Sequence, residues 1–319
     1  MPPTSPADRL RALLRQDRLL LLPCCFDALS AMLIERAGFS ATFMSGFAVA
    51  ASRLALPDTG LISFGEMVEQ GRGICEAVAL PVIGDGDTGY GNALNVKRTV
   101  RTYAAAGFAG VMIEDQLAPK RCGHTRGKQV VGRDEAVMRI RAACDARDEG
   151  ADILILARTD ARATHGLDEA LARARAFTAE GADLLFVEAP HDEAEMARIC
   201  REAPGLHLAN MLAGGATPLL LPDRLRQLGF AMAAYPLLLL SAAIGAMQAA
   251  LAALAAGPVV AEEAPGFAEV RALLRFEDYD DEARRYACRR AAGFTERGSP
   301  EQVSGPNGGI PKPGVSRQS

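Results

Sequence analysis

The sequence predicts an α/β protein, and more specifically a (β/α)8 barrel with extra C-terminal helices. Eight short apolar runs alternate with segments of helical periodicity, which is the number of strands that closes such a barrel. Several helical segments end in glycine, as at Gly38, Gly107 and Gly229, which is typical of a helix that stops before the next strand. A doubly wound open sheet is the alternative, but no Gly-x-Gly-x-x-Gly turn follows the first apolar run.

The predicted strands share a length of a few residues and an apolar composition. They cover residues 19–23, 41–44, 82–84, 110–113, 153–157, 184–187, 206–209 and 231–235. The predicted helices between and after them cover residues 27–37, 64–79, 93–106, 133–147, 167–180, 193–203, 222–228 and 237–256. A short helix at 8–14 precedes the first strand, and two further helical pieces at 265–274 and 277–290 follow the eight units. We therefore expect one barrel domain with C-terminal helices over 1–292 and a disordered tail over 293–319, which is rich in Gly, Ser and Pro.

Composition limits the kind of partner. The chain has 319 residues, and its 35 Lys and Arg against 39 Asp and Glu give a formal charge of -4. Without a basic run, binding to nucleic acid or to an anionic membrane through bulk charge is disfavoured, and we expect a small-molecule substrate. Seven cysteines without metal-type spacing fit a reducing cytoplasm, and no secretory signal is visible. The apolar segment 237–254 is expected to be a buried helix rather than a membrane span.

Carboxylates and other polar residues follow almost every predicted strand. In a barrel these positions converge at the C-terminal mouth, where such folds carry their active sites. They are Ser45, Gly46, Asp85, Asp87, Glu114, Asp115, Arg158, Asp160, Glu188 and Asn210. An acidic ring with one arginine predicts a cation among the carboxylates, and oxygen ligands favour Mg2+ or Mn2+ over zinc. Since any single acid can merely cap the following helix, the prediction depends on the whole set.

A basic loop follows the fourth predicted strand. Cys122 in this loop is flanked by Lys120, Arg121, His124, Arg126 and Lys128. Such surroundings favour a thiol that acts as an acid or a base near neutral pH. A lone cysteine is more often an inert apolar residue, and it is the basic, glycine-flanked context that makes Cys122 a catalytic candidate.

Two further positions suggest how an acidic substrate is held. Arg158 ends a predicted strand, where its fork of donors suits a 2-hydroxy or 2-oxo carboxylate. It can equally form a buried ion pair with Glu188 or Asp160, and both can hold together. The backbone N–H groups of Ser45 and Gly46 could bind an oxyanion. The other histidines, His165, His191 and His207, are expected at the surface or in loops and receive no role.

These residues resemble the isocitrate lyase and phosphoenolpyruvate mutase superfamily from Pro23 to about Tyr286. The matching motifs are Phe-Asp-Ala-Leu-Ser at 26–30, Leu-Pro-Asp at 56–58, Gly-Asp-Gly-Asp-Thr-Gly-Tyr-Gly-Asn at 84–92, Glu-Asp-Gln at 114–116, Lys-Arg-Cys-Gly-His at 120–124, Ala-Arg-Thr-Asp-Ala-Arg at 157–162 and Asn-Met at 210–211. The resemblance implies a Mg2+-binding barrel that forms a homotetramer by exchanging C-terminal helices. It also implies metal binding by Asp85, Asp87, Glu114 and Asp58, catalysis by Cys122, Arg158 and His124, and substrate contacts from Ser45, Gly46, Gly123, Glu188, Asn210 and Thr217.

The thiol-bearing loop is similar to that of the lyases of the superfamily, with the 2,3-dimethylmalate lyase and petal death protein pattern nearest. The resemblance therefore implies cleavage of a 2-hydroxy dicarboxylic acid of the 2-alkylmalate type into a 2-oxo acid and a carboxylic acid. Carboxyphosphonoenolpyruvate phosphonomutases share almost the same loop and are the main alternative, followed by oxaloacetate hydrolase activity. Two departures stand out: Ala213 replaces a usual acid, and Leu238 to Ser241 lack the arginine of methylisocitrate lyases, which disfavours a tricarboxylate substrate.

Overall fold

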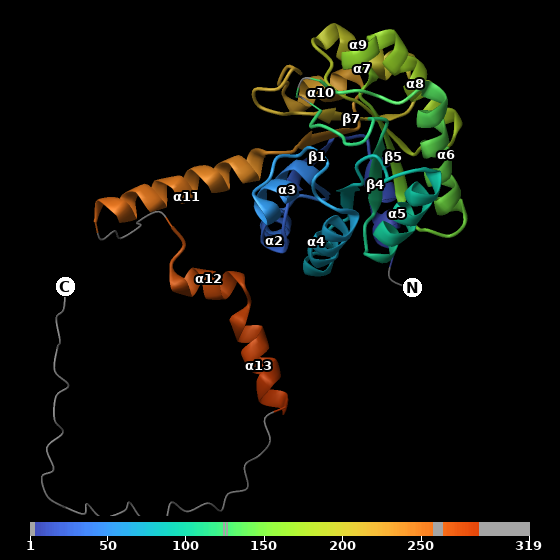
Figure 1. Cartoon of the computed structure of the whole chain (residues 1–319). Helices are drawn as coiled ribbons and strands as arrows, with labels where there is room; N and C mark the ends of the chain where they lie inside the picture. The colour runs from blue at the N-terminus through green and yellow to red at the C-terminus, as the bar shows by residue number, and fades with distance from the viewer. Residues whose placement is uncertain (1–3, 124, 126, 258–263, 287–319) are drawn as a thin grey trace, which may run out of the picture. The chain divides into compact units, whose positions relative to one another are not determined.

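The computed structural model describes residues 4–123, 125, 127–257 and 264–286 (Figure 1). Contacts divide the chain after Gly257, so that the barrel and the C-terminal helices form separate units. The predicted tail falls within residues 287–319, and the end of the last predicted helix with it, so both lie outside the described residues.

Eight parallel strands form a closed barrel in sequence order, which confirms the predicted fold. The barrel closes where β1 pairs with β8, with Leu22 opposite Ala234. The strands are β1 (Leu20–Cys25), β2 (Thr42–Met44), β3 (Val82–Asp85), β4 (Gly110–Glu114), β5 (Leu154–Thr159), β6 (Leu184–Val187), β7 (Leu206–Asn210) and β8 (Met232–Tyr235).

Helices precede, separate and follow the strands, and those between successive strands surround the barrel (Figure 1). They are α1 (Pro6–Leu14), α2 (Ala28–Arg36), α3 (Gly46–Leu54), α4 (Phe64–Ala77), α5 (Ala93–Ala105), α6 (Arg133–Asp148), α7 (Ala161–His165), α8 (Leu167–Ala179), α9 (Glu193–Glu202), α10 (Pro222–Leu228), α11 (Leu238–Ala256), α12 (Phe267–Leu273) and α13 (Phe276–Tyr286). The sequence prediction missed α3 and α7. The small and apolar residues of α3 continue the composition of β2, so no change of period marks the boundary.

The core has two layers that alternate along each strand. In β4, Met112 points into the barrel, where it packs with inward residues of the other strands. Its neighbours Val111 and Ile113 pack outward in the layer beneath the surrounding helices. Because strand side chains alternate between faces, the residue two places after an inward core residue also points inward. This rule decides which polar residues reach the mouth.

The same alternation corrects the expectation for His207. It lies on the outward face of β7 and is fully buried, with Nε2 2.6 Å from the carbonyl oxygen of Ala203. The prediction of a surface or loop position was wrong. It was based on the polarity of the imidazole, although the strand pattern of the sequence also includes His207. His165 and His191 do lie at the surface.

Helix α11 also differs from expectation. Of its residues only Leu240 is buried, while Leu238, Met247, Leu251 and Leu254 are exposed. The predicted burial was wrong for the single chain because the helix extends past the strands that it would have to cover. Among the described residues α11 is the helix whose length and apolar composition would suffice to cross a membrane, a criterion that some helices of soluble proteins also meet.

Candidate active site

Strand alternation brings polar residues at or just past the ends of five strands to the mouth of the barrel. Ile83, Met112, Leu156, Phe186 and Leu208 all point into the barrel. The polar residues of the mouth lie two residues further along each of these strands or just past its end. They are Asp85, Glu114, Arg158, Glu188 and Asn210. Each of these except Glu114 lines a cavity together with Ser45, Asp58, Lys120, Cys122 and Gly123. The structure therefore assembles most of the predicted set from its strand spacing.

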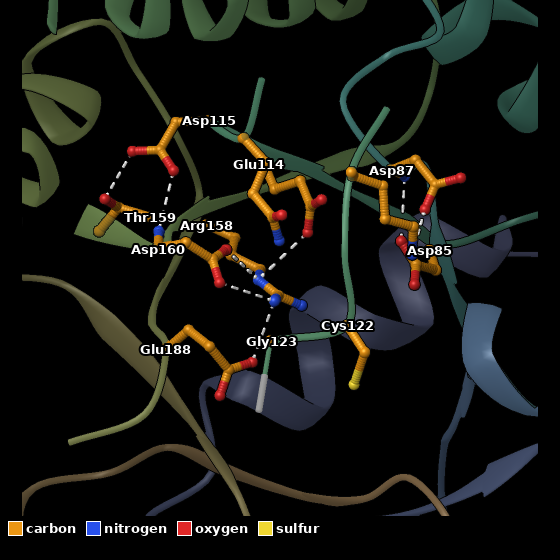
Figure 2. Close-up of polar contacts among 12 residues, drawn as sticks. Asp85, Asp87, Glu114, Asp115, Cys122, Gly123, Arg158, Thr159, Asp160 and Glu188 are labelled. Carbon is orange, nitrogen blue, oxygen red and sulfur yellow. Dashed lines mark hydrogen bonds and ion pairs between the residues drawn. The ribbon is translucent and has the colours of Figure 1, made fainter. Parts of the chain in front are cut away.

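Arg158 is the centre of a buried charge cluster (Figure 2). Its Nε lies 2.8 Å from Oδ2 of Asp160 and 3.3 Å from Oε2 of Glu114, and its Nη2 lies 3.2 Å from Oε2 of Glu188. Burial alone would raise the pKa of Asp160, but the charges of Arg158 and Lys128 outweigh burial and lower that pKa to about 2. These contacts use Nε and Nη2, and Nη1 has no hydrogen-bond partner among the described residues. The predicted ion pairs form, and one donor edge remains for a substrate carboxylate.

A second cluster joins the acids of β3 to a lysine of the basic loop. Lys120 Nζ lies 2.6 Å from Oδ1 of Asp58 and 2.8 Å from Oδ1 of Asp87, and all three side chains are buried. Burial, followed by the charge of Asp87, raises the pKa of Asp85 to about 6. The mouth therefore contains a second cation that the sequence prediction did not assign, yet its acids still outnumber it.

The donor set suits a hydrated divalent ion. Glu114 Oε1 is buried and, among the described residues, has no hydrogen-bond partner, and burial raises the pKa of this carboxyl well above its usual range. Within the described chain no three acidic, cysteine or histidine side chains come close enough to enclose an ion by themselves. Mg2+ typically keeps several waters and takes only one or two carboxylates. A site built on Asp85, with the other acids acting through water, meets that requirement.

The basic loop packs onto the mouth. The Cys122 N–H donates to the carbonyl oxygen of Asp58 at 3.2 Å, and the Gln116 side chain bonds both the N–H and the carbonyl of Arg121. A Cβ at Gly123 would lie 2.5 Å from Nη2 of Arg158 and 2.6 Å from Oε2 of Glu188. Only glycine permits this approach, which places the Cys122 backbone beside the Arg158 cluster (Figure 2).

The start of α3 forms another edge of the cavity. Ser45 is the N-cap of α3, and its own N–H donates to the carbonyl oxygen of Cys25 at 3.1 Å. The first N–H groups of a helix have no partner within the helix, so Gly46 can present such a donor. A Cβ on Gly46 would lie 2.5 Å from Oδ2 of Asp85. The two predicted oxyanion donors were the N–H groups of Ser45 and Gly46. The Ser45 N–H is already bonded, so the geometry favours the Gly46 N–H.

Two of the predicted residues lie outside the cavity, and a third is not described. Asp115 faces away from the cavity, where its carboxylate accepts from Thr159 Oγ1 at 2.6 Å, from the Asp160 N–H at 2.8 Å and from Arg173 Nη1 at 3.0 Å. Asp115 comes three residues after the inward-pointing Met112. Because strand side chains alternate between faces, this spacing points Asp115 outward. Thr217 is buried in the segment after β7 and is not a lining residue of the cavity. His124 lies outside the described residues.

Known proteins provide an independent comparison. A sequence model of the family described as phosphoenolpyruvate phosphomutase matches residues 10–255. The chain is 47% identical over 230 residues to 2,3-dimethylmalate lyase of Eubacterium barkeri, covering 72% of this chain and 79% of that protein. It is 45% identical over 243 residues to the chloroplastic carboxyvinyl-carboxyphosphonate phosphorylmutase of Arabidopsis thaliana, covering 75% of this chain and 71% of that protein.

Solved structures agree with the sequence matches. A crystal structure of 2,3-dimethylmalate lyase superposes with a TM-score of 0.85 at 34% identity, covering 92% of this chain and 100% of that one. A phosphonopyruvate hydrolase in complex with oxalate and Mg2+ superposes with a TM-score of 0.79 at 29% identity, covering 89% of this chain and 99% of that one.

Proposed function

This chain belongs to the phosphoenolpyruvate mutase/isocitrate lyase superfamily of enzymes, and we propose that within it the chain is a Mg2+-dependent carbon-carbon lyase. The substrate is a 2-hydroxy dicarboxylic acid of the 2-alkylmalate type, and the products are a 2-oxo acid such as pyruvate and a carboxylic acid. One observation carries the proposal: the cavity that holds Arg158 and Asp85 is also lined by the Cys122 thiol.

The residues of the chain divide the work between two halves of the substrate. Arg158 Nη1 and the Gly46 N–H bind the carboxylate end that becomes the 2-oxo acid. Asp85, with Asp87, Glu114 and Asp58 nearby, would hold Mg2+ or Mn2+, which would supply Lewis-acid stabilisation of the charge that develops on this half. Loss of the 2-hydroxyl proton to solvent lets the C2–C3 bond break, and Cys122 protonates the departing carbanion as a general acid, with His124 beside it in the sequence. Glu188, Asn210 and Gly123, which line the cavity, orient the substrate, and the packed loop excludes water.

The apolar wall of the cavity indicates the size and polarity of the departing group. Phe47, Leu212, Pro236 and Leu237 line the cavity together with the charged residues. Such a wall favours an alkyl substituent over a third carboxylate, because an unpaired carboxylate would lose its hydration there. This agrees with the absence of an arginine between Leu238 and Ser241.

The phosphonomutase reaction is the second candidate, supported by the 45% identity to the Arabidopsis phosphorylmutase. The two candidates differ in the bond that changes. The purified protein should be incubated with Mg2+ and, separately, with 2-alkylmalates, methylisocitrate, oxaloacetate and a carboxyphosphonoenolpyruvate. Release of a 2-oxo acid from the 2-alkylmalates at the highest kcat/KM is the expected result. Formation of a new phosphorus-carbon bond without cleavage of any malate would establish the mutase instead, and preferred hydrolysis of oxaloacetate would establish the hydrolase.

The exposed apolar face of α11 fits the homotetramer that the superfamily resemblance implies, in a cytoplasmic enzyme. Leu251 and Leu254 are each 66% exposed in the single chain, and burial of such side chains favours association. Light scattering should give a mass near four chains. A monomer at micromolar concentration would contradict the assembly.

A further inference from the structure

Lys128 at the end of the basic loop is buried, although lysine is rarely buried without a partner. Its Nζ lies 2.8 Å from Oδ1 of Asp160 and also donates to the carbonyl oxygen of Gly123. The ammonium therefore bridges the Asp160 carboxylate and the backbone next to Cys122. None of the roles assigned above to the mouth residues uses this side chain.

Asp160 is itself fixed from two other directions. Arg158 contacts both of its carboxylate oxygens, at 2.8 Å from Nε and 3.1 Å from Nη2. The Asp160 N–H donates to Asp115, which is held in turn by Arg173. The Asp160 carboxylate that orients Arg158 is thus held in a fixed position, and Lys128 links the loop to this same carboxylate.

Lys128 attaches the loop at Gly123, where the backbone passes close to the Arg158 cluster. A Cβ added at Gly123 would collide with both Arg158 and Glu188, and the Gly123 carbonyl is the group that Lys128 holds. A hydrogen bond from a charged donor is about twice as strong as a neutral one. Releasing it would let the Cys122–Gly123 peptide move away from the guanidinium.

We propose that Lys128 is a positioning residue that holds the Cys122 thiol in register with Arg158 by linking the Gly123 carbonyl to Asp160. The inference rests on the proposed function only for its effect on turnover. A merely structural role would be to neutralise Asp160, and that role would not change the exposure of Cys122.

The test compares Lys128→Met with Lys128→Arg and with the control Lys97→Met, which removes a lysine from a surface ion pair with Glu149. The readout is the alkylation rate of Cys122 by iodoacetamide in the full chain without substrate, followed by mass spectrometry of the Cys122 peptide. We expect Lys128→Met to raise this rate about tenfold, because losing charge-assisted bonds makes local opening easier. Lys128→Arg should restore most of the protection, and Lys97→Met should match the wild type.

Turnover gives a second readout that depends on the proposed reaction. With a 2-alkylmalate, kcat of Lys128→Met should fall about a hundredfold, a loss typical of a slightly misplaced catalytic group. If the wild type cleaves no malate, the proposed function fails while the alkylation result still decides the role of Lys128. If Lys128→Met does not fold, Lys128→Gln, which keeps a donor without the charge, takes its place with a smaller expected increase. An unchanged or slower alkylation rate in the folded variant would overturn the inference.

Discussion

The two charge clusters at the barrel mouth are built from the same residue types but are balanced differently. The Arg158 cluster has three acids, Glu114, Asp160 and Glu188, against two cations, Arg158 and Lys128. Among the residues that the structure describes, the Asp85 cluster also has three acids, Asp58, Asp85 and Asp87, but one contacting cation, Lys120. With every acid counted as ionised, the Arg158 cluster carries one net negative charge and the Asp85 cluster carries two.

The pKa shifts follow this difference. In the Arg158 cluster, the cations overcome burial at Asp160 and lower its pKa to about 2, although burial still raises the pKa of Glu114. In the Asp85 cluster, burial and Asp87 dominate and raise the pKa of Asp85 to about 6. The first cluster is therefore complete within the protein, whereas the second is stabilised when a cation from solution joins it. The division matches a site in which one half orients a carboxylate and the other binds a metal.

Removal of divalent ions is expected to have the largest effect. Exhaustive treatment with EDTA should abolish turnover, because the charge surplus of the Asp85 cluster then has no counter-ion. Activity should return when Mg2+ or Mn2+ is added. Full activity in the chelated enzyme would show that Lys120 alone balances these acids.

Asp85→Asn and Asp160→Asn should change the stability of the metal-free protein in opposite directions. The folded pKa of Asp85 lies above its ordinary 3.8, so its ionisation costs stability as pH rises from about 4 to about 6. At pH 7 Asp85→Asn should therefore raise the free energy of unfolding, and the gain should shrink near pH 4.

The folded pKa of Asp160 lies below 3.8, so its contribution is present above about pH 4 and is lost as pH falls towards 2. At pH 7 Asp160→Asn should lower the free energy of unfolding. Each shift should be on the order of 2 kcal/mol, from roughly two pKa units. Urea unfolding in EDTA at pH 7 and pH 4 measures both. Changes of the same sign would contradict the proposed difference between the clusters.

Lys120→Met should give the smallest effect. Removing the cation that contacts Asp58 and Asp87 makes the Asp85 cluster more negative and frees both of these carboxylates. Affinity for Mn2+, measured by calorimetry, should rise roughly three- to tenfold on simple charge grounds. Lys97→Met removes a lysine that is paired with Glu149 instead of with the acids of the mouth, and it should leave the affinity unchanged. Weaker binding by Lys120→Met would mean that the lysine orders the site instead of competing with the metal.

Strand spacing accounts for what the sequence could predict. Asp85, Glu114 and Arg158 each follow an inward apolar residue by two places, so their meeting at the mouth follows from the barrel alone. The contacts of the loop lysines could not be found in this way. The sequence shows five cations around Cys122, but only packing decides that Lys120 and Lys128 turn inward. The exposure of α11 could not be predicted from the sequence either, because its apolar composition is the same as that of a helix buried in a core.

The measurement that tests the account most directly is a comparison of Cys122→Ser with the wild type on a 2-alkylmalate. A serine hydroxyl is a far weaker acid than a thiol, so kcat should fall by about 10²- to 10⁴-fold, as for loss of a general acid. Affinity for a pyruvate-like inhibitor should stay nearly unchanged, because Arg158 and Gly46 still bind the oxo-acid half. Cleavage by the variant at near the wild-type rate would contradict the acid role of Cys122 and, with it, the main support for a lyase over a mutase.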